Sequence, residues 1–157
     1  NPEDYDARAN IMWASSMALA GFQFLLGKPS PTFPLHGMGH ELSSRYDMTH
    51  GVTLALLTPA WMRHTMKAVP EHLPLFARFG RNVFDAREED DAKAAEEGVR
   101  KLEEFYAVIK MPANLREAGG KEEDLEAIAG KAVEDGKLGI LDSLGKDEVL
   151  QILRAAY

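Results

Sequence analysis

Apolar residues recur three and four positions apart along most of this chain, which is the spacing of one face of an α-helix. The pattern predicts helices over residues 71–84, 98–111, 121–133 and 146–157. The acidic stretch 87–97 leads into the second of these and is interpreted as a solvated helix face. No run of residues alternates apolar and polar positions as a half-buried strand would. The sequence therefore predicts an all-α protein, a multi-helix bundle.

Residues 5–26 predict one long helix that is apolar on almost every side. No charged residue lies between Arg8 and Lys28, so the stretch is close in length to the roughly 20 residues of a membrane span. Four polar residues interrupt it: Asn10, Ser15, Ser16 and Gln23. Such a helix is typical of the centre of a large helical domain. We expect it to be buried in protein, and we expect no membrane partner.

Prolines mark the next boundaries along the chain. A Pro-rich loop over 27–34 separates the first helix from a second helix over 34–46. Thr49 is suited to cap a third helix over 50–66. Pro59 lies inside this third pattern and is expected to kink or divide the helix.

The chain opens on a helix-start pattern and without a methionine. Asn1 can cap a helix, and Pro2 suits the first helical position. We expect from this opening that a preceding part of the protein has been cut away.

The composition is typical of one globular domain. Of the 157 residues, 45% are hydrophobic and 27% are charged, and the formal net charge is −7. This charge argues against a nucleic-acid partner, because such binding needs clustered Lys and Arg. The lack of cysteine excludes disulfides, thiolate metal ligands and a cysteine nucleophile. It is compatible with the reducing cytoplasm, where we expect the protein to be.

Three of the five histidines fall within eighteen positions. His36 and His40 stand four residues apart, one turn along the same face of the predicted second helix. His50 follows at the start of the third helix, so a tight turn could aim all three rings at one point. Neutral imidazole is the commonest protein ligand for transition metals, and the spacing is compatible with a metal site. It is not the HExxH pattern, because Glu41 follows the second histidine.

The residues alone leave the nature of this cluster open. A metal site needs about four protein ligands, or three and an open position, and three histidines from one short stretch are cramped. Either the site is incomplete, or it takes ligands from residues outside this chain, or all three histidines form a structural site. An ordinary surface or core role is the remaining alternative. His64 and His72 lack such neighbours and are interpreted as surface residues.

Two stretches resemble one known family, the iron-containing (group III) alcohol dehydrogenases, in its C-terminal helical domain: DYDARANIMWASSMALAGF and HGMGHELSSRYDMTHGVTLALLTPAWMRH. The similarity is greatest to the butanol dehydrogenase and aldehyde reductase branch, and it extends over essentially the whole chain. Its most specific part is the motif HxxxHxLxxxxxxxHG. The resemblance implies a fold that is the distal part of a dehydroquinate synthase-like helical domain.

The resemblance also implies the roles of the histidines. Enzymes of this family hold Fe2+, sometimes Zn2+, with one Asp and three His, and the last two ligands correspond to His36 and His50. His40 then lies beside the nicotinamide and the substrate, as a catalytic and cofactor-binding residue. The family's first two ligands have no match in this chain, and neither has its nucleotide-binding domain. Residues 1–157 are thus expected to be a partial C-terminal metal-binding helical domain, with the N-terminal nucleotide-binding domain absent.

Two functional hypotheses follow. In the first, the chain is part of a NAD(P)-dependent enzyme that transfers hydride between the nicotinamide and a primary alcohol or aldehyde, and the chain alone is inactive, with no cofactor bound. The Pro-rich loop before the motif differs from the Gly-Asp-Trp that is common in the branch, and this leaves the substrate class open. In the second, the chain is a non-catalytic helical module with no metal. In either case we expect apolar faces left uncovered to favour a homo-oligomer.

Overall fold

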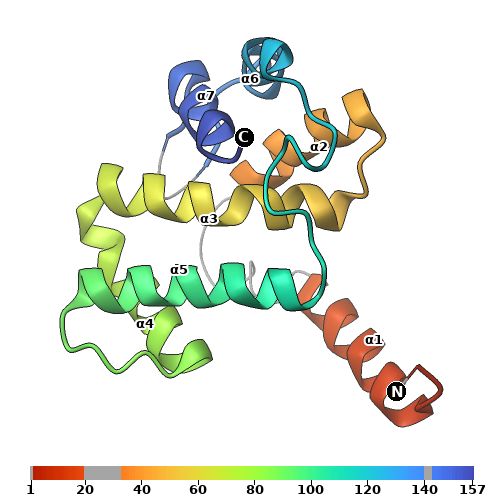
Figure 1. The fold of residues 1–157 in the computed structure, drawn as a ribbon, viewed down its shortest axis with the longest axis vertical. Helices are drawn as coiled ribbons and strands as arrows, with labels where there is room; N and C mark the ends of the chain where they lie inside the picture. The colour runs from red at the N-terminus through yellow and green to blue at the C-terminus, as the bar shows by residue number, and fades with distance from the viewer. Residues whose placement is uncertain (1, 20–32, 140–142) are drawn as a thin grey trace. The chain divides into compact units, whose positions relative to one another are not determined.

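The structure is a computed structural model that describes residues 2–19, 33–139 and 143–157. These residues form two units, 1–31 and 32–157, which are described separately. The helices are α1 (Tyr5–Leu19), α2 (Pro34–Tyr46), α3 (His50–Ala68), η1 (Pro70–His72), α4 (Leu73–Phe84), α5 (Asp91–Val108), η2 (Glu122–Asp124), α6 (Leu125–Ala132) and α7 (Lys146–Ala155) (Figure 1). Within the described ranges the only extended pairing is an isolated bridge between Leu138 and Leu144. The all-α prediction is confirmed.

Helix α1 is capped by Asp4, whose carboxylate accepts a hydrogen bond from the backbone N–H of Ala7 at 3.0 Å. The expected burial of this helix is wrong for its described part, because Ile11 and Trp13 are 69% and 68% exposed. The predicted continuation over 20–26 lies outside the described residues. Of the helices that the structure describes, none is long and apolar enough to cross a membrane.

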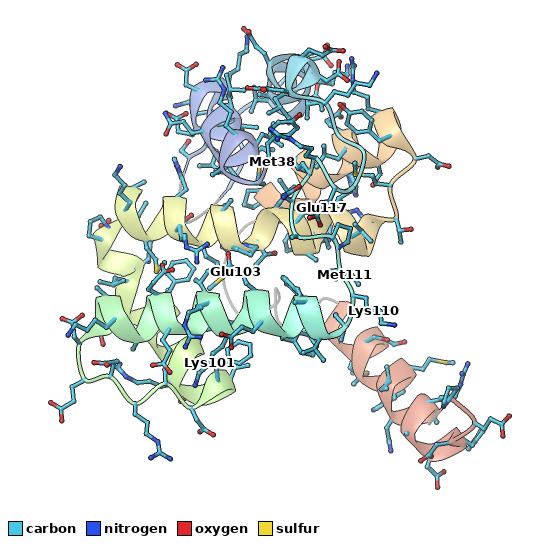
Figure 2. The ribbon with its side chains drawn as sticks, in the orientation of Figure 1. Met38, Lys101, Glu103, Lys110, Met111 and Glu117 are labelled. Atoms are coloured by element: carbon cyan, nitrogen blue, oxygen red, sulfur yellow. The ribbon has the colours of Figure 1, made fainter. Side chains whose placement is uncertain are left out.

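Helix α3 is the centre of the larger unit. It contacts α2 and α7 on one side and α5 on the other (Figure 1). The main core lies between α2, α3, α6 and α7, where Met38, Leu57 and Leu153 are fully buried. Met38 is labelled in Figure 2. Each helix gives an apolar stripe to this core at three- and four-residue spacing, as α7 does with Val149 and Leu153.

A second core lies between α3, α4 and α5, and small residues bring α4 and α5 into close contact. A Cβ atom on Gly98 would lie 2.6 Å from the Cα of Gly80, so neither position has room for a side chain. Ala77, Ala94 and Ala95 are fully buried beside them. The helix backbones can approach this closely because both crossing residues lack a side chain.

The bounds of α2 are those that the sequence predicts, from Pro34 at the first helical position to Tyr46. Thr49 occupies the N-cap position of α3, although its side chain makes no capping hydrogen bond. Pro59 lies within one uninterrupted helix, so of the two effects expected of it, a kink or a division, the division is wrong.

Ion pairs join helices that are distant in sequence. Arg63 on α3 donates to both Glu96, at 2.7 Å, and Glu103, at 2.5 Å, on α5. Glu103 points from α5 toward α3 (Figure 2). Near the far end of α2, Asp124 accepts hydrogen bonds from Arg45 and from the hydroxyl of Tyr46, which ties α2 to η2.

Candidate metal centre

His36 and His40 lie on the outer face of α2. Both side chains are exposed, whereas Met38 and Leu42 on the opposite face are fully buried in the main core. This division follows from the helical period, since residues four apart share a face and residues two apart do not. Burial of the apolar stripe therefore fixes the direction in which the two imidazoles point.

The turn after α2 brings a third imidazole to the pair. Asp47 ends α2 in the left-handed conformation, with φ 54° and ψ 30°, which Asp adopts more readily than most residues. The backbone carbonyl of Thr49 accepts hydrogen bonds from the N–H groups of Val52, at 2.9 Å, and Thr53, at 3.2 Å. These bonds start α3 at His50, and so place its side chain beside the N-terminal half of α2.

The three rings gather at one place. The centroid of the His50 ring lies 5.0 Å from that of His36 and 4.7 Å from that of His40, and the His36 and His40 rings are 6.0 Å apart. A tetrahedral metal ion bound about 2.1 Å from one nitrogen of each of two imidazoles keeps the ring centres about 5 Å apart. The separations of the His36 ring and of the His40 ring from the His50 ring are both compatible with a shared ion.

Gly39 allows the close approach of α2 and α3 that this convergence needs. Gly39 lies between the two histidines of α2, and a Cβ there would be 2.8 Å from the Oγ1 of Thr53 on α3. Thr53 is fully buried, and its hydroxyl donates to the backbone carbonyl of His50 at 2.8 Å. A Cβ on Gly37 would lie 2.9 Å from the side chain of Leu138, which follows α6, so this glycine packs against another part of the unit.

The electrostatics of the cluster favour the neutral form of His36. Desolvation lowers the pKa of His36, and the charges of protonated His50 and His40 would lower it further. The Nδ1 atom of His50 is buried and has no hydrogen-bond partner among the described residues. A buried ring nitrogen without a hydrogen-bond partner can bind a metal ion, or can pair with a residue that the described ranges do not include. The donor set and this orphaned atom therefore fit a transition-metal site.

The described residues do not complete such a site. In the ranges that the structure covers, no group of three or more His, Asp and Glu side chains is arranged to hold a metal ion. This finding counts against the structural three-histidine site. It leaves open ligation by two of the histidines with further ligands from residues outside the chain, and an ordinary role without a metal. Asp47 lies in the connecting turn and is exposed.

The other histidines differ from the prediction. His64 and His72 are half-buried and not on the open surface. His64 lines a cavity of about 610 Å3 between α3, α5 and α7, which Tyr106 and Gln151 also line and which contains none of the three clustered histidines. Sequence reasoning also missed the contact of Gly39 with Thr53, because it joins residues on two different helices.

A family model described as the C-terminal part of the Fe-containing alcohol dehydrogenase family matches residues 1–157. The NADH-dependent butanol dehydrogenase A of Clostridium acetobutylicum is 39% identical over 99% of the chain, and the chain covers 40% of that protein. The NADPH-dependent aldehyde reductase YqhD of Escherichia coli is 30% identical, with 99% and 38% coverage. The crystal structure of the NADH-dependent butanol dehydrogenase A of Thermotoga maritima is similar with a TM-score of 0.84 and 29% identity, over 99% of the chain and 40% of that structure.

Proposed function

This chain belongs to the Fe-containing alcohol dehydrogenase family, and from that premise we propose that it is the metal-binding helical part of a two-domain alcohol dehydrogenase or aldehyde reductase. Its substrate is a primary alcohol or aldehyde, and its coenzyme is NADH or NADPH. The names of the relatives, which include butanol dehydrogenases and an aldehyde reductase, support this choice of substrate. The chain spans about 40% of the length of those relatives, and in this proposal the nucleotide-binding domain belongs to residues outside these 157.

Each histidine has a role in this proposal. His36 and His50 bind Fe2+ or Zn2+ in this proposal. The observation that supports a metal here is the convergence of the three rings on the Nδ1 of His50, which has no hydrogen-bond partner among the described residues, and the choice of His36 over His40 rests on the resemblance to the family. A bound metal supplies Lewis acidity that polarises the alcohol or aldehyde oxygen. His40 is exposed and lies beside the same cluster. It orients the substrate and the nicotinamide, and moves a proton to or from the substrate oxygen.

The remaining metal ligands come from residues outside the chain in this proposal. Two histidines alone bind a metal weakly, because affinity falls with each missing ligand. We therefore expect the 157-residue chain by itself to bind metal poorly and to have no dehydrogenase activity. Turnover by the isolated chain would contradict this expectation.

A non-catalytic helical module is the second candidate function. Its support is that the described residues do not by themselves complete a metal site. The exposed apolar side chains of α1, such as Ile11 and Trp13, favour association of the 157-residue chain with copies of itself.

The test is metal analysis and turnover of the full-length protein that contains this chain. His36→Ala and His50→Ala should each lower the metal content per subunit and abolish alcohol oxidation. His40→Ala should keep the metal and lose turnover. His72→Ala is the matched control, because His72 lies on η1 and outside the cluster. Full metal content and normal turnover in the His36 and His50 variants would refute the proposal and favour the non-catalytic module.

A further inference from the structure

The cavity between α3, α5 and α7 is separate from the histidine cluster, because none of the three clustered histidines lines it. Its volume of about 610 Å3 is within the range of sites that bind small organic molecules. Figure 2 shows one of its lining residues, Met111, just beyond the end of α5. Apolar side chains from three parts of the fold line it with Met111, among them Leu56, Ala60, Ala107 and Ile152. The cavity therefore offers an apolar surface to a ligand.

A proline places a hydrogen-bond acceptor in the wall of this cavity. Pro59 lies inside α3 and has no N–H, so the carbonyl of Ala55, four residues earlier, lacks its usual helical donor. Both residues line the cavity, and Ala55 is only 8% exposed. The nearby hydroxyl of Thr58 donates to the carbonyl of Leu54 instead, at 2.7 Å. Among the described residues, no side chain donates a hydrogen bond to the carbonyl of Ala55.

The charged groups of the cavity do not favour a charged ligand. Arg63 and Glu103 both line it, and Arg63 donates to Glu103 at 2.5 Å and to Glu96 at 2.7 Å. Lys67 lies in the last turn of α3 and is exposed to solvent. A buried acceptor without a donor costs free energy, and a ligand that supplies a donor recovers it. The lining thus suits an uncharged molecule with one donor and an apolar body.

We propose that this cavity binds an uncharged aliphatic alcohol of medium chain length, as a second ligand site apart from the histidine cluster. The hydroxyl donates to the carbonyl of Ala55, and the carbon chain lies against the apolar lining. An ether of the same size lacks the proton that this bond needs, so the site distinguishes the two molecules. The inference does not rest on the proposed function, because it needs neither a metal nor a nicotinamide.

The test is calorimetric binding of 1-hexanol and of its isomer pentyl methyl ether to the full-length protein, with and without metal. Pro59→Ala supplies the missing helical N–H, which then competes for the carbonyl of Ala55. It should weaken the binding of 1-hexanol by about fivefold, which is one hydrogen bond of about 1 kcal/mol at 1.4 kcal/mol per factor of ten. The binding of the ether should not change. Pro70→Ala is the matched control, because Pro70 lies at the start of η1 and outside the cavity, and it should leave both affinities unchanged.

A second variant tests the location of the site independently of the proline. Ala107 is an exposed residue of α5 that lines the cavity, so Ala107→Trp should fill the space and abolish the binding of both molecules. Equal effects of Pro59→Ala on the alcohol and the ether, or undiminished binding in Ala107→Trp, would overturn the inference. It would also be overturned if the wild-type protein bound neither molecule, since other residues would then fill the cavity. Hexanoate that binds as tightly as 1-hexanol would contradict the uncharged ligand and indicate Lys67 as the contact.

Discussion

The substitution Gly39→Ala tests whether contact between α2 and α3 sets the position of the imidazoles. A Cβ at this position would lie 2.8 Å from the Oγ1 of Thr53 and 3.4 Å from a methyl carbon of Leu54. Ordinary close contacts between carbon and oxygen are about 3.3–3.6 Å, so the helices must separate by about 0.5 Å or the hydroxyl must move. The hydroxyl is fully buried and bonded to the carbonyl of His50, which makes its movement costly.

The expected change in the free energy of unfolding for Gly39→Ala is the sum of two opposing effects. Overpacking of a close contact costs about 1–3 kcal/mol, and replacing a helical glycine by alanine returns up to about 1 kcal/mol of helix propensity. We therefore expect Gly39→Ala to lower the free energy of unfolding of the 157-residue chain by about 1–2 kcal/mol. In the full-length protein we expect the metal content to fall as well, because His36 and His50 lie on the two helices that are forced apart.

The assay is urea unfolding followed by circular dichroism, with two further variants. Gly51→Ala is the control, because a Cβ at this exposed glycine would meet nothing within 4 Å, and its stability should not fall. Thr53→Ala removes the obstructing hydroxyl. On its own it should lower the free energy of unfolding by about 1 kcal/mol, because the hydrogen bond to the carbonyl of His50 is lost. The double variant Gly39→Ala, Thr53→Ala should lose less free energy of unfolding than the two single variants lose together. Additive effects, or a Gly39→Ala chain as stable as the Gly51→Ala chain, would refute the packing argument.

Two further predictions concern other parts of the fold. Gly98→Ala should lower the free energy of unfolding by about 3 kcal/mol in the same assay, because its Cβ would lie 2.6 Å from the Cα of Gly80. A Gly98→Ala variant as stable as the wild type would contradict the close packing of α4 and α5. The hydrogen bonds from Arg45 and Tyr46 lower the pKa of Asp124 to about 2. Because an unfolded Asp titrates near about 3.9, this carboxylate stabilises the fold above that pH, and the contribution is lost as the pH falls toward 2. Asp124→Asn should therefore flatten the pH dependence of the urea midpoint between about pH 4 and pH 2, and an unchanged slope would count against the ion pair.

Local signals in the sequence predicted the elements that carry the candidate site. The bounds of the helix over 34–46 follow from Pro34 at its start and from the loss of the helical pattern at Asp47. The start of α3 at His50 follows from the turn that Thr49 begins. Since helical spacing alone places His36 and His40 on one face, the sequence could also predict that a third histidine just beyond a tight turn would meet them.

Other features depended on contacts that no local pattern contains. The apolar stretch of α1 predicted burial, yet Trp13 is exposed, because burial depends on which segments cover a helix and not on its own composition. The close approach of Gly80 and Gly98 joins two helices that pack through small residues, and each glycine alone looks like an unfavourable helix position. His64 is half-buried because α5 and α7 fold beside α3, which its own neighbours in sequence do not reveal.

The most direct test of the metal centre is a crystal structure of the iron-loaded full-length protein with anomalous diffraction measured at the iron edge. The account predicts one anomalous peak about 2.0–2.3 Å from a ring nitrogen of His36 and from a ring nitrogen of His50, with His40 beyond bonding distance and the other ligands outside this chain. A peak that lies away from both rings, or one that is bonded to His40 in place of either, would contradict it.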